Sequence, residues 1–311
     1  MNILVTSPSF MKVDGEHKNL LETHFKNIDY FPGPHDNNSM IKFANLYDGI
    51  ICGDDIITDE FIKKSVPKLK VVSKYGIGLD KIDVKSLEIN NIRLFNCAGV
   101  NSLTVAEHAL GSIISGLRNT FLSVIDTHNS VWNRLIGRDL STSKIGIIGY
   151  GNVGKDLEKL LIPLANELFI YDINLKDHKK INNSNYLNDI KEIYKNADVI
   201  CLCLSLNKNT SGLISDEVVN LFKDEMILIN VSRGEIVNEM AILNGINNNK
   251  IKYYITDVLE DEINFLNSKL VNNNRVFITP HIASRTSDNI KNQGKMSVEN
   301  LIKGFKMLWK Y

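Results

Sequence analysis

The chain has 311 residues, of which 43% are hydrophobic and 23% charged, and this composition fits a globular protein large enough for two domains. Its 36 basic and 36 acidic residues cancel, so no broad electrostatic field favours nucleic acid or an anionic membrane. No stretch approaches the roughly 20 apolar residues of a membrane span, and the N-terminal sequence does not resemble a secretion signal. We therefore expect a cytoplasmic protein with no nucleic-acid or membrane partner.

The first hundred residues alternate short apolar runs with polar, helix-compatible stretches. The runs cover residues 3–5, 49–52, 69–73 and 92–95. This rhythm predicts a parallel sheet covered by helices.

A long helical pattern follows over residues 102–117, and a second sheet rhythm begins after it. We expect six more strands at residues 144–148, 168–171, 199–202, 226–230, 252–256 and 276–279. Six strands with helical stretches between most of them predict a doubly wound nucleotide-binding domain.

The segment from 144 to 172 is the most informative part of the sequence. Gly149, Gly151 and Gly154 form a G-x-G-x-x-G pattern directly after an apolar run, and Asp172 ends a second run about twenty residues later. The glycines permit a tight turn, close approach of the backbone to a pyrophosphate and close packing of the following helix. An ordinary glycine turn would explain the triplet alone, but not the strand, the helix 152–161 and the acidic tip together.

Asp172 also indicates which dinucleotide binds. Its carboxylate can accept hydrogen bonds from the adenosine ribose hydroxyls and repel a 2'-phosphate, and residues 173–175 include no arginine. NAD is therefore the predicted cofactor, and Asp257, at a strand end, could hold the nicotinamide amide. We expect cofactor contacts from Gly149, Gly151, Asn152, Val153, Gly154, Asp172, Ser232, Asp257 and Thr104.

The glycine fingerprint normally opens a nucleotide-binding domain, yet here it lies near the middle of the chain. An earlier domain must precede it. Residues 288–309 read as one amphipathic helix that we expect to return and pack on that first domain. The predicted domains are therefore 1–99 with 284–311, and 100–283, joined by short hinge-like crossings.

Three ionisable residues stand just beyond strands of the second domain, where open α/β sheets bind ligands. Arg233 can hold a carboxylate bidentately, and His281 can exchange a proton near neutral pH. Glu262 could orient the imidazole from its far ring nitrogen. Each residue alone has an ordinary explanation, as a turn cap, a loop histidine or a solvated acidic run, but together they are what NAD-dependent oxidation of a 2-hydroxy acid requires.

Several separated motifs then resemble one known family, the D-isomer-specific 2-hydroxyacid dehydrogenases. They are GYGNVG, VSRGEIV around Arg233, DVLEDE ending in Glu262, TPHIA around His281, KYGIGLDKID from Lys74 and NSLTVAEHALG from Asn101. The resemblance covers nearly the whole chain, and the KYGIGLD loop is most similar to the phosphoglycerate dehydrogenase branch.

The resemblance implies an α/β fold of two doubly wound domains, in which a Rossmann NAD-binding domain is inserted in a flavodoxin-like substrate domain, and a homodimer. It implies Arg233 as carboxylate binder, His281 as acid/base and Glu262 as its partner. Domain closure would bring substrate and nicotinamide together. The implied substrate-binding residues are Lys74, Tyr75, Gly76, Ile77, Gly78, Arg233 and His281.

The chain departs from the family pattern in several places. Ile263 replaces the usual proline after the glutamate, Lys81 replaces a common asparagine, and residues 203–205 replace a His-x-Pro-like stretch. Lys74 stands where an arginine is frequent; a cation there could meet a substrate phosphate, although a lysine at a strand end is more often solvated. Because the chain ends at Tyr311, we expect no regulatory C-terminal domain.

The four cysteines, at positions 52, 97, 201 and 203, lie in or beside apolar strand-like runs, and no His/Cys cluster has zinc spacing. We expect buried, reduced thiols and no metal. The apolar pattern over residues 121–132 is compatible with dimerisation and equally with packing within the chain.

The predicted function is NAD-dependent interconversion of a small (R)-2-hydroxy acid and its 2-oxo acid, such as 3-phosphoglycerate/3-phosphohydroxypyruvate or glyoxylate/hydroxypyruvate. Two alternatives stay open: the same scaffold acting on phosphite or formate, and a non-catalytic NAD(H)-sensing, corepressor-like protein. The sequence does not choose the acid, because selectivity depends on loops around residues 7–11, Asp54 and the last helix.

Overall fold

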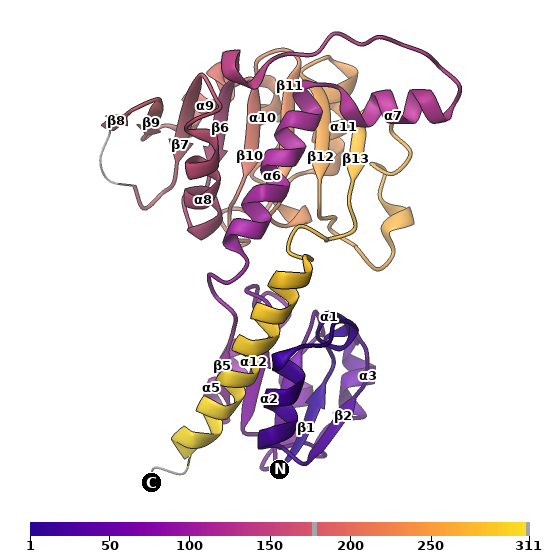
Figure 1. The fold of residues 1–311 in the computed structure, drawn as a ribbon, viewed down its shortest axis with the longest axis vertical. Helices are drawn as coiled ribbons and strands as arrows, with labels where there is room; N and C mark the ends of the chain where they lie inside the picture. The colour runs from indigo at the N-terminus through magenta and orange to yellow at the C-terminus, as the bar shows by residue number, and fades with distance from the viewer. Residues whose placement is uncertain (176–178, 309–311) are drawn as a thin grey trace. The chain divides into compact units, whose positions relative to one another are not determined.

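The computed structural model describes residues 1–175 and 179–308 and divides into two compact units (Figure 1). Unit 1 comprises Met1–Asn101 with Ser284–Tyr311, and unit 2 comprises Ser102–Ala283. The ranges expected from the sequence are 1–99 with 284–311, and 100–283. The predicted fold class, two parallel-sheet α/β units, is confirmed.

Unit 1 is built on a five-stranded parallel sheet with the order β2-β1-β3-β4-β5. This is the flavodoxin-like strand order. The alternation of apolar and polar runs predicts every strand of this sheet except β2. The strand β2 was not predicted, because its residues form a polar edge strand with little buried surface. The strands are β1 (Asn2–Val5), β2 (Asn27–Tyr30), β3 (Gly49–Cys52), β4 (Val71–Lys74) and β5 (Arg93–Phe95).

Helices cover the sheet of unit 1, and the last of them comes from the far end of the chain. They are α1 (Pro8–Lys12), α2 (Glu16–His24), α3 (Asn37–Ile41), α4 (Asp59–Ser65), α5 (Val84–Ile89) and α12 (Ser287–Leu308). Val298, Leu301 and Phe305 of α12 share a core with Ile3 and Val5 of β1. The expected return of the C-terminal helix to the first domain is therefore confirmed; Trp309, which the sequence placed in this helix, lies outside the described residues.

Unit 2 is built on an eight-stranded sheet with the order β13-β12-β11-β10-β6-β7-β9-β8, parallel except for the β8–β9 pair. All six expected strands are present. The additional pair, β8 and β9, forms a hairpin at the edge that the sequence analysis did not predict. The strands are β6 (Lys144–Ile148), β7 (Glu167–Tyr171), β8 (Lys179–Ile181), β9 (Ser184–Leu187), β10 (Val199–Leu202), β11 (Met226–Asn230), β12 (Ile251–Thr256) and β13 (Val276–Ile278).

Both faces of this sheet are buried, which explains why its strands are near-continuous apolar runs. One core lies under α6 (Ser102–Leu117) and α8 (Asn152–Leu161), and the other under helices of the opposite face (Figure 1). The remaining helices of unit 2 are α7 (Thr120–His128), α9 (Ile190–Asn196), α10 (Asp216–Asn220) and α11 (Glu239–Asn247).

Across the described residues, no helix combines the length and apolarity that crossing a bilayer requires. Cys52, Cys97 and Cys201 are buried free thiols, whereas Cys203 is only half-buried, so the expectation of four buried thiols is wrong for Cys203. The cause is its position at the end of β10, where the strand leaves the core. Its sulfur lies 3.8 Å from that of Cys201.

A buried histidine joins α2 to the C-terminal helix of unit 1. The ring of His17 is fully buried, its Nε2 lies 3.1 Å from the carbonyl oxygen of Phe10, and a Cβ on Gly294 would approach the ring to 2.7 Å. Burial lowers the pKa of His17 below its ordinary value of 6.5, against a smaller raising effect of the Phe10 carbonyl. The helix contact is therefore built for a neutral imidazole.

We predict that unit 1 loses stability as the pH falls below about 6.5, because the unfolded chain then binds a proton that the folded His17 resists. The contribution of the neutral His17 to the free energy of unfolding is fully present above the pKa of His17 in the unfolded chain. It declines as the pH falls toward the lower pKa of His17 in the folded protein. Urea unfolding of wild type and His17→Phe between pH 8 and 5 measures this slope. The variant should lose it, whereas a His24→Gln control, altered at an exposed histidine of the same helix, should keep it; equal slopes in all three proteins would contradict the prediction.

Candidate active site

The glycine fingerprint forms the turn between β6 and α8. Gly149 has a φ of +99°, and a Cβ there would lie 2.5 Å from the carbonyl oxygen of Cys203. A Cβ on Gly154 would collide with the carbonyl oxygen of Gly149, so the helix can pack this closely only with glycine. Among the residues that the structure describes, no atom lies within 4 Å of the Cβ position at Gly151, so the backbone there is open to a ligand. This turn fits a pyrophosphate, with Asn152 and Val153 opening α8 beside it.

Asp172 lies at the end of β7 and contacts the glycine turn. Its Oδ2 accepts a hydrogen bond from the backbone N–H of Tyr150 at 2.8 Å, and its Oδ1 accepts from the backbone and side chain of Asn174 at 2.8 and 3.1 Å. The carboxylate is thus held beside the turn, and its contact with the ribose hydroxyls stays a prediction.

The other predicted cofactor residues lie on separate elements of unit 2. Ser232 is buried after β11, and its hydroxyl donates to the carbonyl oxygen of Leu202 at 2.8 Å, which ties the ends of β11 and β10 together. Thr104 lies in the first turn of α6 and is half-buried. Direct cofactor contacts by these residues stay predictions.

Arg233 follows β11 directly and is half-buried, with Nη1 donating to the carbonyl oxygen of Ser232 at 2.8 Å. Its neighbour Gly234 packs against the chain that leads to Glu262. A Cβ on Gly234 would overlap the carbonyl carbon of Leu259 and the nitrogen of Glu260. Because glycine has no Cβ, the turn that carries Arg233 can approach the loop that carries Glu262 this closely.

His281 and Glu262 form an ion-pair geometry. Nδ1 of His281 lies 2.9 Å from Oε1 and 3.0 Å from Oε2 of Glu262, and each side chain is 33% exposed. His281 has a φ of +52°, which is unusual for a residue with a side chain. The structure brings together the two residues that the sequence placed after different strands, and Ile263, the departure from the family proline, does not prevent the pairing.

Asp257 explains how His281 is held in that conformation. Its buried carboxylate accepts hydrogen bonds from the hydroxyl of Thr279 at 2.6 Å and from the backbone N–H groups of Ile282 at 2.9 Å and Ala283 at 2.7 Å. Nε2 of His108 on α6 lies 3.9 Å from the same carboxylate. Asp257 thus grips the turn on both sides of His281, and its contact with the nicotinamide amide stays a prediction.

The predicted substrate loop belongs to unit 1. Gly76 has a φ of +123°, and residues 75–78 are half-buried. Lys74 is not solvated, contrary to the ordinary expectation for a lysine at a strand end: Nζ donates to the carbonyl oxygen of Gly53 at 2.5 Å and to Oδ1 of Asp54 at 2.7 Å, and the side chain is 7% exposed.

Residues 110–283 match the family model described as D-isomer specific 2-hydroxyacid dehydrogenase, NAD binding domain. The chain belongs to this family. The D-3-phosphoglycerate dehydrogenase of Archaeoglobus fulgidus is 27% identical over 305 residues, and the match covers 97% of this chain and 57% of that protein. The hydroxypyruvate reductase of Thermotoga maritima is 28% identical over 239 residues, covering 76% of this chain and 77% of the relative.

Among solved structures, the NAD⁺-bound 3-phosphoglycerate dehydrogenase of Entamoeba histolytica superposes with a TM-score of 0.81 at 25% identity, covering 98% of this chain and 95% of that one. The predicted family and the NAD cofactor are confirmed. The chain spans little more than half the length of the Archaeoglobus relative, 57%.

Several residues around the site were not predicted from the sequence. His108 and Thr279 contact Asp257, and the half-buried Tyr150 joins the buried Glu158 and Tyr186 in a hydrogen-bonded cluster. One signal was available: Glu158 lies on the apolar stripe of α8 with Gly154, Leu157 and Leu161. A charged residue at such a position indicates a buried polar partner.

We predict that Gly234→Ala lowers kcat/KM and stability together, because the added Cβ must displace the backbone at Leu259 and Glu260 and with it Glu262. Overpacking of this kind costs about 1–3 kcal/mol. The control is Lys195→Ala, at an exposed residue of α9 in the same unit. That variant should leave kcat/KM and stability nearly unchanged, because alanine is a good helix former. Thermal unfolding and steady-state kinetics of both variants test the prediction, and full activity in Gly234→Ala would contradict it.

Proposed function

We propose that this protein is an NAD-dependent oxidoreductase that interconverts a small (R)-2-hydroxy acid and its 2-oxo acid. The observation that carries the proposal is the pairing of His281 with Glu262 at 2.9 Å, beyond the carboxyl ends of the strands of an NAD-binding domain. Arg233 follows β11 at the same edge of the sheet, where open α/β folds bind their ligands.

The three side chains divide the reaction among them. In the direction of reduction, protonated His281 donates a proton from Nε2 to the carbonyl oxygen as that oxygen gains electron density. Glu262 accepts a hydrogen bond from Nδ1, which fixes the ring orientation and favours the protonated imidazole. The Arg233 guanidinium holds the substrate carboxylate and polarises the neighbouring carbonyl. NAD(H), when bound, supplies or accepts the hydride.

The pairing of Lys74, the cation that begins the predicted substrate loop, favours an unphosphorylated acid. Nζ of Lys74 lies 3.9 Å from the Cβ position of Gly76, but its charge is already paired with Asp54 at 2.7 Å. A second carboxylate, Asp55, is buried close by and accepts from the backbone of Gly53 at 2.9 Å. A phosphate would have to compete with Asp54 for this lysine. We therefore propose glyoxylate- or hydroxypyruvate-like substrates before 3-phosphohydroxypyruvate.

We predict that His281→Ala lowers kcat by about 10²- to 10⁴-fold, the usual contribution of a general acid, with little change in NADH affinity. Arg233→Ala should also raise KM for the oxo acid by about 10- to 150-fold, as expected for the loss of a charge-assisted hydrogen bond worth about 1.5–3 kcal/mol. Arg275→Ala is the control, because Arg275 lies just before β13 whereas His281 follows that strand. It should change neither kcat nor KM.

NADH oxidation at 340 nm against glyoxylate, hydroxypyruvate, 3-phosphohydroxypyruvate, pyruvate and branched 2-oxo acids measures these constants. Turnover that survives in His281→Ala would contradict the mechanism. A preference for 3-phosphohydroxypyruvate would contradict the substrate class alone. No turnover of any acid, with tight NADH binding, would favour the NAD-sensing alternative or an acid outside the panel.

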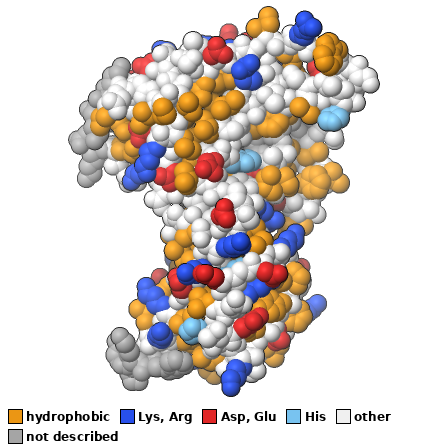
Figure 2. Space-filling view, in the orientation of Figure 1, with side chains coloured by type: hydrophobic (Ala, Val, Ile, Leu, Met, Phe, Trp, Pro, Cys, Tyr) orange, Lys and Arg blue, Asp and Glu red, His pale blue; other side chains and the backbone are white. Residues whose placement is uncertain are grey.

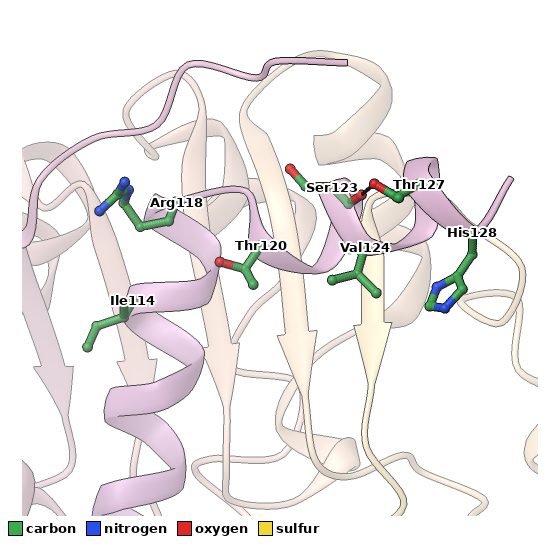
Figure 3. Close-up of a pocket in the computed structure, with 7 residues that line it drawn as sticks. All are labelled: Ile114, Arg118, Thr120, Ser123, Val124, Thr127 and His128. Carbon is green, nitrogen blue, oxygen red and sulfur yellow. Dashed lines mark hydrogen bonds between the residues drawn. The ribbon is translucent and has the colours of Figure 1, made fainter. Parts of the chain in front are cut away.

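We also propose that two copies associate through α6, α7 and the segment after α7. Helix α7 buries none of its residues, and Val124, Val131 and Trp132 are exposed, Trp132 by 82%. A shallow pocket between α6 and α7 is lined in part by Ile114 and Val124 (Figure 3), and hydrophobic side chains reach the surface over α6 (Figure 2). Of the two explanations left open for residues 121–132, this exposure favours association, which would remove the apolar surface from water.

We predict that the wild type sediments at twice the chain mass of 35.1 kDa and that Trp132→Asp shifts it toward the single-chain mass, because a carboxylate would be buried without a partner. Ile89→Asp, at a residue 78% exposed in unit 1, is the control and should stay dimeric. Sedimentation velocity at several concentrations makes the comparison. A wild type that remains at the single-chain mass throughout would refute the proposed dimer.

A further inference from the structure

Glu158 is a buried carboxylate that the proposed reaction does not use. It lies on α8, is 5% exposed, and sits on the buried stripe with Gly154 and Leu161. The donors that the structure shows for it are two tyrosine hydroxyls: Tyr186 donates to Oε1 at 2.7 Å, and Tyr150 donates to Oε2. An ionisable group is costly to bury, so its position beside the glycine turn calls for an explanation.

Tyr150 connects this cluster to the cofactor site. It stands between Gly149 and Gly151 in the fingerprint, its ring packs edge-on against that of Tyr186 at 5.5 Å, and the two hydroxyls lie 3.3 Å apart. The backbone N–H of the same residue donates to Asp172 at 2.8 Å. One residue therefore has its side chain fixed by Glu158 and its backbone bonded to the predicted ribose-binding carboxylate.

The glycines on either side make this anchor necessary. Glycine restricts the backbone least of all residues, and a Cβ at Gly151 would meet no atom of the described chain within 4 Å, so packing by these residues does not hold that side of the turn. If the Tyr150 side chain were released, its peptide could rotate and the N–H would leave Asp172. Burial and the bond to Glu158 raise the pKa of Tyr150, so the phenol remains a donor across the physiological range.

We propose that Tyr150 and Glu158, supported by Tyr186, are positioning residues for the adenosine half of NAD. They hold the glycine turn and Asp172 in one arrangement before the cofactor arrives, so binding does not have to order them. This inference rests on the proposed role of Asp172 as the ribose-binding residue. It concerns cofactor binding and not the hydride or proton transfer at His281.

The test measures binding of NADH and of ADP-ribose, which lacks the nicotinamide, by titration calorimetry. Tyr150→Phe and Glu158→Gln should each lower the affinity for NADH and for ADP-ribose by about tenfold, while kcat at saturating NADH changes less than twofold. Tyr194→Phe is the matched control: it removes from α9 of the same unit a buried hydroxyl that has no hydrogen-bond partner among the described residues, and it should leave both affinities unchanged.

Each outcome bears on the inference separately from the proposed reaction. Unchanged affinities in folded Tyr150→Phe and Glu158→Gln would overturn it, as would loss of NADH binding with ADP-ribose binding intact, or a wild type that binds neither ligand. If Tyr150→Phe does not fold, Glu158→Gln and Tyr186→Phe carry the test. A wild type that binds ADP-ribose but reduces no oxo acid would refute the reaction while the affinity comparison still decides the positioning role.

Discussion

The grip of Asp257 on the turn after β13 is the interaction on which the candidate site depends. A histidine with a φ of +52° persists only where surrounding contacts over-determine it, and the carboxylate supplies them through Thr279 on one side and Ile282 and Ala283 on the other. Because Asp257 ends one strand and the turn follows the next, the register of β12 and β13 places the imidazole. Without that grip, Nδ1 of His281 would not be held within 3.0 Å of Glu262.

A steric constraint complements this polar one. Gly234 lets the chain at Leu259 and Glu260 pass against the turn that carries Arg233, so the two candidate side chains that flank β12 are set by backbone contact and not by their own flexible stems. The sheet thus positions the turns that follow β11, β12 and β13. These turns carry Arg233, Glu262 and His281, respectively. This is the rigid support that a proton-transfer site needs to keep donor and acceptor within hydrogen-bond reach.

The sequence predicts most of this fold because both faces of most parallel strands are buried, which produces apolar runs that stand out from their surroundings. This rule does not identify β2, which is a polar edge strand, or the β8–β9 hairpin, whose strands are short. The candidate residues after strands could be found because strand order determines where they converge. The partners of Lys74 and Tyr150 could not, since Asp54 and Glu158 reach them through tertiary contacts that no local pattern encodes.

The buried carboxylates of unit 2 differ in the groups that donate hydrogen bonds to them. Those at the amino ends of the strands have different donors from those toward the carboxyl ends. At the amino end of β10, burial alone would raise the pKa of Asp198, but hydrogen bonds from Lys223 and the Lys144 backbone, together with nearby Arg138, lower it. Toward the carboxyl ends, Glu158 is held by phenols, and Asp257 mainly by a hydroxyl and amides. Neutral donors satisfy these oxygens without placing a fixed cation beside them. Glu158 and Asp257 therefore order the turns beside them through neutral hydrogen bonds, whereas Asp198 joins charged side chains at the other edge.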